Sequence, residues 1–344
     1  MIGDPLRFHG DQLARPGTLD LAVNIWPTPR SPELSEALAA ALTSSQPYPD
    51  AVPATAAIAR RHRRPVEEVL TLNGACEAFW LLAQALRPRH AVCIHPAFTE
   101  PDAALHASGI TVDHVLRRPH DSWSLDPAAV PETADLVVLG NPNNPTGTLD
   151  PATAVASLAR PGRMLVVDES FLDLTQDTDQ SLAARRDLPG LVVVRSITKL
   201  WGLAGLRAGY CLAPPDLIQA MRHQGQPWSV NTIALAALEH CASDRTTPPR
   251  VAADVAAARA DLLRRIGDLP GLRAWPSAAN FLLLHAPGRG PEVIERLASA
   301  GIIVRPAHTF PGLDGDYLRV AVRTPEAHAR LADALATALY AERT

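Results

Sequence analysis

The stretch that decides the fold reads RSITKLWGLAGLRAGY and runs from Arg195 to Tyr210. It follows the β-branched run LVVV at 191–194 and leads into a second apolar run, AGYCLA, at 208–213. Between the two runs stand one lysine, Lys199, and a turn punctuated by glycine. A buried strand that ends in polar residues and glycine is typical of the edge of a parallel sheet, where ligands bind.

The rest of the chain supports such a sheet. From about residue 66, short β-branched runs alternate with longer Ala/Leu-rich amphipathic stretches. This alternation indicates βαβ units, and it predicts an α/β fold whose mostly parallel sheet is covered by helices on both faces. The predicted strands are 69–72, 91–95, 110–115, 135–140, 164–168, 191–195 and 208–213.

The rhythm changes after SDRTTPPR at 243–250. A helix at 251–266 and helices from Pro291 and Pro325 then alternate with short strands, as in a small α+β domain. The predicted strands here are 271–275, 281–285, 302–305 and 317–322. We expect three parts, which are an N-terminal arm (1–30), a large domain (31–245) and a small C-terminal domain (246–344).

Composition argues against several classes of protein. The net charge of -4 gives no field that would attract nucleic acid or an anionic membrane. No apolar run approaches the roughly 20 residues of a membrane span, and the first residues lack the pattern of a secretion signal. The four cysteines form no C-x-x-C pair, and the twelve histidines show no metal-binding spacing. We expect a cytoplasmic protein without a metal site.

Four strand ends carry unusual polar residues. Gly74 lies in NGACE, Asn144 in NPNNPTG, Asp168 in DES and Lys199 in SITK. Each alone is explained as well by a turn, a helix cap or a surface cation. Because the carboxyl ends of parallel strands meet at one edge of a sheet, all four together favour a shared ligand. The turn at Gly74 does not read G-x-G-x-x-G, which argues against a nicotinamide dehydrogenase.

Pyridoxal 5′-phosphate needs this combination of groups. A lysine can form a Schiff base with its aldehyde. A carboxylate can pair with the ring nitrogen and keep it protonated, so that the ring accepts electrons. The Gly-Ala pair at the start of a helix offers backbone N–H groups to a phosphate, and Ser196 and Arg207 add a hydroxyl and a guanidinium.

The motifs NPNNPTG, VVDES and SITK followed by GLAGLRAGY resemble those of the fold-type I pyridoxal-phosphate enzymes of aminotransferase class I and II. Their order and spacing match, including the interval from Lys199 to Arg207, and the likeness runs over nearly the whole chain. The resemblance implies a large domain with the cofactor, a small α+β domain and a homodimer with shared active sites. A non-catalytic protein that retains the fold is a further alternative, which four intact cofactor residues disfavour.

The resemblance also implies residue roles. Lys199 forms the Schiff base, Asp168 pairs with the ring nitrogen and Asn144 bonds the phenolic oxygen. Phe98 of HPAFTEP stacks on the ring, and Tyr48 of PYPD reaches the cofactor phosphate of the partner subunit. The phosphate is held by Gly74, Ala75, Cys76, Ser196 and Arg207.

Substrate residues are implied at both ends of the chain. Arg319 of YLRVAVRT matches the arginine that binds a substrate anion, and Arg305 is a candidate for a second anion. Arg323 lies roughly 13 Å from Arg319 along the strand, at about 3.3 Å per residue, and suits a surface position equally well. Asn24 of NIWPTP belongs to the arm that closes over the substrate. His9 either helps to close the site or belongs to a flexible terminus.

Two branches of the family are most similar to this chain, histidinol-phosphate aminotransferase and L-threonine-O-3-phosphate decarboxylase of cobalamin synthesis. The segments LDLAVNIWP, YPD and IIVRPAHTFPGL look more like the second. Phe171 replaces the usual tyrosine three residues after Asp168, as in many sequences of the decarboxylase branch. HGD and NIWPTP depart from the usual HGG and NINPLG, in the arm that contacts substrate. We therefore expect a decarboxylase of L-threonine O-3-phosphate, with a histidinol-phosphate-type aminotransferase as the alternative.

Overall fold

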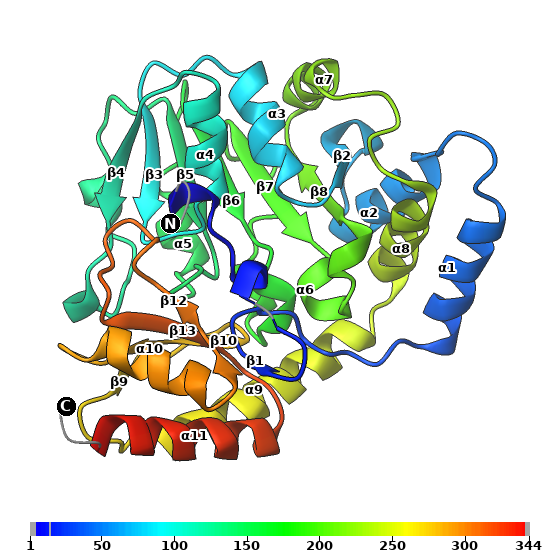
Figure 1. The fold of residues 1–344 in the computed structure, drawn as a ribbon. Helices are drawn as coiled ribbons and strands as arrows, with labels where there is room; N and C mark the ends of the chain where they lie inside the picture. Colours follow the sequence, from blue (N-terminus) through cyan, green and yellow to red (C-terminus); the bar gives the residue numbers. More distant parts are fainter. Residues whose placement is uncertain (1–4, 14, 341–344) are drawn as a thin grey trace.

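The structure, a computed structural model, describes residues 5–13 and 15–340. Its centre is a seven-stranded sheet with the order β2-β8-β7-β6-β5-β3-β4 (Figure 1). Strand β8 runs antiparallel to both of its neighbours, and all other pairs are parallel. All seven predicted strands are confirmed, as β2 (Val69–Asn73), β3 (Ala91–His95), β4 (Val112–Leu116), β5 (Leu136–Gly140), β6 (Met164–Asp168), β7 (Leu191–Ser196) and β8 (Ala208–Leu212).

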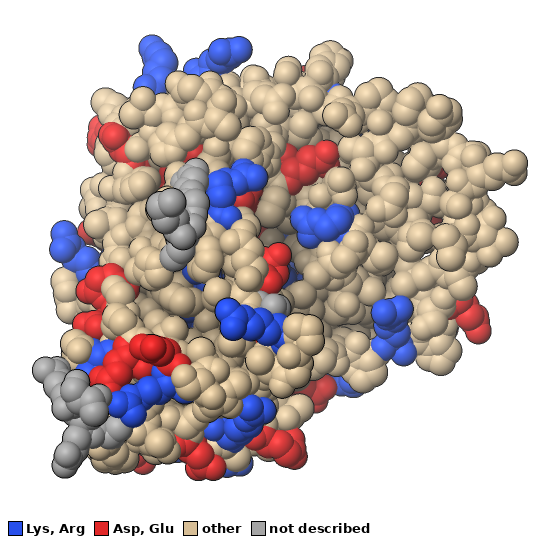
Figure 2. Space-filling model, in the orientation of Figure 1, with Lys and Arg blue, Asp and Glu red and all other residues tan. Residues whose placement is uncertain are grey.

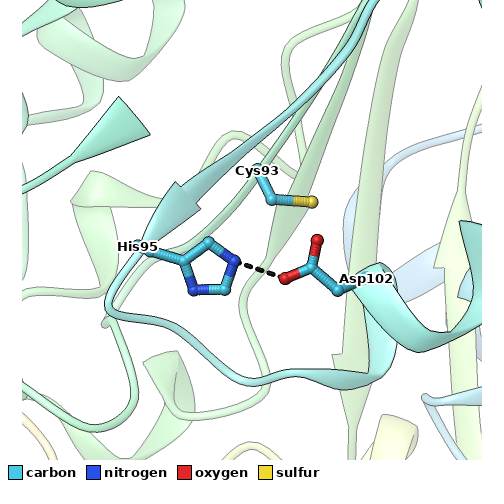
Figure 3. A group of neighbouring side chains, drawn as sticks. All are labelled: Cys93, His95 and Asp102. Atoms are coloured by element: carbon cyan, nitrogen blue, oxygen red, sulfur yellow. Dashed lines mark hydrogen bonds and ion pairs between the residues drawn. The ribbon is translucent and has the colours of Figure 1, made fainter. Parts of the chain in front are cut away.

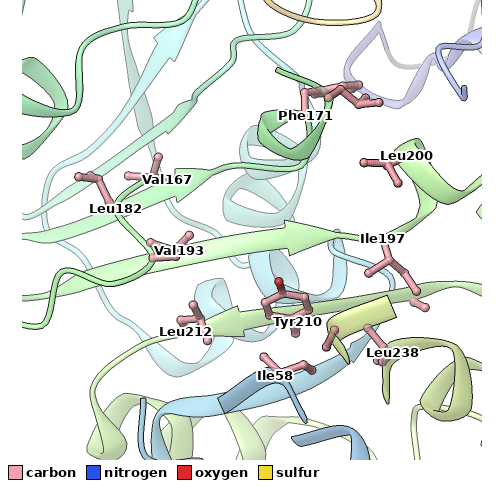
Figure 4. Close-up of a cluster of buried hydrophobic side chains, with 14 of the residues drawn as sticks. Ile58, Val167, Phe171, Leu182, Val193, Ile197, Leu200, Tyr210, Leu212 and Leu238 are labelled. Atoms are coloured by element: carbon pink, nitrogen blue, oxygen red, sulfur yellow. The ribbon is translucent and has the colours of Figure 1, made fainter. Parts of the chain in front are cut away.

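Helices cover both faces of this sheet. Helices α2 and α8 pack on one face, where Ile58 and Leu238 contact a layer that includes Val193 (Figure 4). Helices α3, α4 and α7 pack on the other face, against Val192 and Val194. Because side chains alternate along a strand, the uninterrupted apolar run of β7 supplies both layers. The helices of this part are α1 (Pro32–Thr43), α2 (Val52–His62), α3 (Glu77–Ala85), α4 (Glu100–Ala107), α5 (Ala152–Ala156), α6 (Thr198–Trp201), α7 (Pro215–Gln224) and α8 (Thr232–Ser243).

A second, antiparallel sheet follows in the C-terminal part, with the order β12-β13-β10-β9. Helices α9, α10 and α11 pack on it around a separate apolar cluster. The elements are α9 (Thr247–Ile266), β9 (Arg273–Ala274), β10 (Phe281–His285), α10 (Gly290–Ser299), β11 (Ile302–Ile303), β12 (Arg305–Pro306), β13 (Tyr317–Ala321) and α11 (Pro325–Tyr340). The division of the chain at residues 30 and 245 stays a prediction.

The predicted single strand at 302–305 is wrong. The structure divides it at Val304 into β11, which pairs in parallel with β1 (Leu19–Asp20), and β12, which pairs with β13. The physical reason is a partner far away in sequence, because the N-terminal arm supplies β1 as the neighbour of β11. This pairing anchors the arm on the C-terminal part.

The distribution of surface charge and the length of the apolar helices complete the description of the fold. On the face in Figure 2, basic and acidic side chains are interspersed, and neither sign forms a continuous field. Among the described residues, helices long and apolar enough to cross a membrane are absent.

Candidate active site

The carboxyl ends of neighbouring strands bring the predicted cofactor residues to one edge of the large sheet. Asp168 is the last residue of β6, and Gly140 pairs with it at the end of β5. A pocket at this edge is lined by Asp168, Asn144 and Phe98, together with Phe171. Of the four strand-end residues predicted to converge, Asn144 and Asp168 line this pocket.

The carboxyl group of Asp168 lies within this pocket wall. Its Oδ1 accepts the backbone N–H of Ser170 at 2.9 Å. Burial raises the pKa of Asp168, while hydrogen bonds from Ser170 and the charge of Lys199 oppose the rise. A cation placed in the pocket would therefore stabilise the ionised carboxylate strongly, as a protonated ring nitrogen does.

Lys199 follows β7, within the short helix α6. Burial lowers the pKa of its amine, and the positive charge of Arg319 lowers it further. Its Nζ lies 3.5 Å from Asn24 Oδ1 and 5.8 Å from the centre of the Phe171 ring. A buried amine with a lowered pKa is a better nucleophile than an exposed lysine.

The composition of the chain points to Lys199 as the Schiff-base residue more strongly than the motif around it does. Lys199 is the single lysine among 32 lysine and arginine residues. An arginine cannot take its place in Schiff-base chemistry, because the guanidinium stays protonated. This compositional fact separates Lys199 from a solvated surface cation, and the motif-based prediction did not use it.

The turn from β2 into α3 contains the residues that are predicted to form a phosphate cradle. Gly74 has a φ of +83°, and a Cβ there would clash with Arg207 Nη2 and lie 2.9 Å from its Cζ. Behind it, a Cβ on Gly209 of β8 would come within 2.5 Å of Ala75 N. Both glycines therefore let the backbone of the turn approach the guanidinium and β8 closely. Gly209 was missed, although a glycine inside an apolar strand signals such a close approach.

Hydroxyl groups complete the cradle. Ser196 Oγ lies 2.7 Å from Thr198 Oγ1 and accepts the backbone N–H of Thr198 at 3.2 Å. Thr198 was not among the predicted site residues. Its position two residues after Ser196 is the one sequence feature that places its hydroxyl near this group. Cys76 is the N-cap residue of α3, and burial raises the pKa of its thiol to about 11. The thiol therefore stays protonated and adds no negative charge beside a phosphate.

These residues fit pyridoxal 5′-phosphate. Among the described residues, the Arg207 guanidinium makes one long hydrogen bond, from Nη1 to Ala204 O at 3.4 Å, and so keeps donors for an anion. Asn24 is 5% exposed, and its Nδ2 has no hydrogen-bond partner among the described residues. A buried amide donor without a partner is costly and indicates a ligand acceptor. The amine, the carboxyl group and the cradle match the aldehyde, ring nitrogen and phosphate of the cofactor.

Arg319 of β13 borders the same site. Its Nη1 donates to Asn144 Oδ1 at 2.5 Å, and its Nη2 donates to Ala22 O at 2.6 Å. Burial lowers the pKa of Arg319 to about 9, and the charges of Arg305 and Arg323 contribute. Within the described part of the chain, Arg319 forms no direct ion pair with a carboxylate, and Asp20 acts on its charge only from farther away.

Arg305 is similar. Its Nη2 donates to Phe8 O and to Thr309 Oγ1, both at 2.7 Å. The guanidinium lies between the rings of Phe8 and Phe310, and burial lowers its pKa to about 10. It too has no carboxylate ion pair among the residues that the structure describes. The N-terminal arm and the C-terminal part thus meet at this cation.

The sequence left two roles open, for Arg323 between a substrate ligand and a surface cation, and for His9 between closing the site and a flexible terminus. In the structure both side chains make hydrogen bonds. Arg323 is partly buried and donates to Val23 O of the arm, so it is not a free surface cation. His9 Nε2 lies 2.8 Å from Glu100 Oε1, and its ring lies 5.8 Å from that of Phe98. The arm is therefore held to the C-terminal part through Val23 and to α4, beside the pocket residue Phe98, through His9.

Tyr48 lies apart from these contacts. Its side chain is 75% exposed, and its ring stacks on that of Trp228 at 4.2 Å between centroids. A single chain therefore does not bring Tyr48 to the residues that hold the cofactor, and its predicted role depends on a partner subunit.

The comparisons with known proteins agree with this geometry. The family model described as "Aminotransferase class I and II" matches residues 16–335. A protein named histidinol-phosphate aminotransferase from Mycobacterium tuberculosis is 45% identical, over 92% of this chain and 87% of the relative. Threonine-phosphate decarboxylase of Salmonella typhimurium is 33% identical, over 93% of this chain and 91% of the relative.

A solved structure shares the fold. Histidinol-phosphate aminotransferase of Sinorhizobium meliloti, in complex with pyridoxal-5′-phosphate, superposes with a TM-score of 0.83. The match covers 93% of this chain and 90% of that one, at 23% identity. Because the family model matches most of its length, the chain belongs to the pyridoxal-phosphate-dependent aminotransferase class I and II family.

Proposed function

We propose that the protein decarboxylates L-threonine O-3-phosphate. The observation that carries this proposal is the pair of buried guanidinium groups, Arg305 and Arg319, neither of which pairs with a described carboxylate. They are 3% and 5% exposed. Burying an unpaired cation is costly, so a substrate with two anionic ends would stabilise both arginines at once. Threonine phosphate has a carboxylate and a phosphate.

The residues of the chain would divide the work as follows. When bound, pyridoxal phosphate supplies an electron sink for the bond broken at the substrate α-carbon. Asp168 would hold the ring nitrogen protonated, and Phe98 and Asn144 would fix the orientation of the ring. After the bond to the carboxylate breaks and carbon dioxide leaves, the buried amine of Lys199 would deliver a proton to the α-carbon in its place. Arg305 and Arg319 would hold the substrate so that its carboxylate bond lies perpendicular to the ring.

The homodimer also belongs to this proposal. Among the described residues, seven large apolar side chains are exposed, and five of them lie on α1, on α2 and on the neighbouring segments. Burying them would stabilise a pair of subunits by the hydrophobic effect. A second subunit would also bring Tyr48 to the cofactor phosphate of its partner. The five are Leu42, Tyr48, Val52, Val66 and Trp228, which are 45% to 75% exposed.

The second candidate is histidinol-phosphate aminotransferase, which the 45% identity to the mycobacterial relative favours. Glutamate, an amino donor with two carboxylates, would also suit two arginines. The arginine pair therefore supports a substrate with two anionic ends, and the products decide which reaction is catalysed.

The deciding assay offers holoenzyme L-threonine O-3-phosphate alone, and histidinol phosphate with 2-oxoglutarate in parallel. We expect release of carbon dioxide and formation of aminopropanol phosphate in the first reaction. Glutamate formation in the second reaction, without carbon dioxide in the first, would replace the decarboxylase by the aminotransferase.

A further inference from the structure

A buried polar cluster borders the pocket, whose lining includes Cys93. Figure 3 shows three of its members, Cys93, His95 and Asp102. Asp102 Oδ2 accepts from His95 Nε2 at 2.5 Å, and Oδ1 accepts from His114 Nε2 at 3.2 Å. The thiol of Cys93 lies within 4.8 Å of this carboxyl group and of the His95 ring. Asp102 and His95 are fully buried. None of these four residues was among the predicted site residues.

The protonation of the cluster follows from its hydrogen bonds. The backbone N–H of Ala97 donates to His95 Nδ1 at 3.2 Å, so Nδ1 carries no proton. The ring proton of His95 is therefore on Nε2, where it is donated to Asp102. Burial lowers the pKa of His95 and keeps its ring neutral. The hydrogen bond to Asp102 raises the pKa of the partly exposed His114, while burial opposes the rise and Asp113 adds to it.

The cluster closes a turn that faces the cofactor. His95 is the last residue of β3, and Asp102 lies in the first turn of α4. Their bond therefore joins the two ends of the segment 96–101, which places Phe98 in the pocket wall. Within the same turn, Pro96 O accepts from Asn143 Nδ2 at 2.9 Å, next to Asn144.

We propose that Asp102 and His95 are positioning residues for the cofactor: their hydrogen bond fixes the turn that holds Phe98 against the pyridine ring. The proposal rests on the cofactor site of the proposed function and is independent of the substrate. A small displacement of a group that contacts the ring lowers binding and turnover, because alignment is lost.

A metal site at the same residues is the competing explanation, since thiolate, imidazole and carboxylate are all zinc ligands. A histidine that binds zinc through Nε2 carries its proton on Nδ1 and donates it to an acceptor. Here the N–H of Ala97 faces Nδ1, so two donors would oppose each other. The hydrogen-bonded arrangement therefore favours the positioning role.

The test is Asp102→Asn with Asp113→Asn as a matched control. An asparagine at 102 accepts from one histidine and turns its N–H groups toward the other. Asp113 also contacts a histidine, His90 at 3.0 Å, but it is exposed and outside the cluster. Both variants are titrated with pyridoxal phosphate alone. Fluorescence gives the Kd, and visible circular dichroism reports the orientation of the bound cofactor.

We expect the Kd of Asp102→Asn to rise at least tenfold and its visible dichroism at saturation to change, while Asp113→Asn stays within twofold of wild type. A folded Asp102→Asn protein with the wild-type Kd and dichroism would overturn the proposal, as would one equivalent of zinc that is lost in this variant. If Asp102→Asn does not fold, His95→Gln takes its place with the same two outcomes. A wild-type chain that binds no pyridoxal phosphate would reject the proposed function as well.

Discussion

Arg207 lies against the α-carbon of Gly74, so that residue 74 has no room for a side chain. The φ of +83° at Gly74 also disfavours any L side chain. The guanidinium and the turn at the start of α3 are thereby brought together around one point, which is the site that we assign to the cofactor phosphate.

Gly74→Ala should therefore weaken cofactor binding. The added methyl group displaces the Arg207 guanidinium, and we expect the Kd for pyridoxal phosphate to rise roughly tenfold or more, as for the loss of a charged hydrogen bond. Gly109→Ala is a matched control, because Gly109 has a φ of +74° and no atom within 4 Å of its added Cβ. Equal Kd values for the two variants, measured by fluorescence titration, would show that Arg207 does not bind the phosphate.

Asp168→Asn should lower kcat more than it lowers cofactor binding. The amide keeps the shape of the side chain but cannot stabilise a protonated ring nitrogen, so the electron sink weakens. We expect kcat to fall about 100-fold or more, the usual size for loss of one electrostatic contact in an active site. Steady-state kinetics at saturating cofactor checks this, and a kcat within threefold of wild type would exclude the role.

Arg305→Ala should raise KM for threonine phosphate by about 10- to 100-fold, which corresponds to one hydrogen-bonded charge. Because the side chain also fastens Phe8, Arg305→Lys provides a variant that keeps the charge and loses the fork-shaped contact. Arg89→Ala removes an arginine whose side chain is 94% exposed and should leave KM unchanged. If KM in Arg305→Ala matches that in Arg89→Ala, the substrate anion binds elsewhere.

The buried side chain of His62 should make the stability of the fold decrease at acidic pH. It accepts or donates a 2.8 Å hydrogen bond with Tyr210, and burial together with nearby Arg195 lowers its pKa to about 3. Between about pH 6.5 and pH 3 the unfolded chain binds this proton and the folded chain does not. The free energy of unfolding should therefore fall as pH decreases through that window, by up to about 1.4 kcal/mol per pH unit from this group.

Urea unfolding at pH 7, 5 and 4 measures this loss. In His62→Gln the side chain does not titrate, and the decrease in stability below pH 6.5 should be smaller. Identical pH profiles for the variant and the wild type would mean that His62 is protonated in the folded protein.

Local patterns were sufficient to predict the large sheet. Runs such as LVVV at 191–194 are apolar at every position because both faces of the sheet are covered, and their polar ends point to one edge. The division at Val304 could not be predicted from local sequence, because β11 takes a partner from the N-terminal arm. Pairings between distant segments depend on the folded chain and leave no local periodicity.

The same limit applies to the site. Motif residues such as Asp168 and Lys199 follow strands and could be predicted to converge. The anchoring of His9 to Glu100 and the hydrogen bond of Asp102 to His95 depend on how α4 packs, so the sequence spacing does not reveal them. That Lys199 is the one lysine of the chain follows from the composition alone.

The central claim is that the amine of Lys199 forms the covalent bond to pyridoxal phosphate, and the composition makes this claim easy to test. Holoenzyme is reduced with borohydride, digested and analysed by mass spectrometry. We predict one pyridoxyl phosphate per chain, on the peptide that contains Lys199. A reduced holoenzyme without that label, or with the label only on the N-terminal amine, would contradict the account.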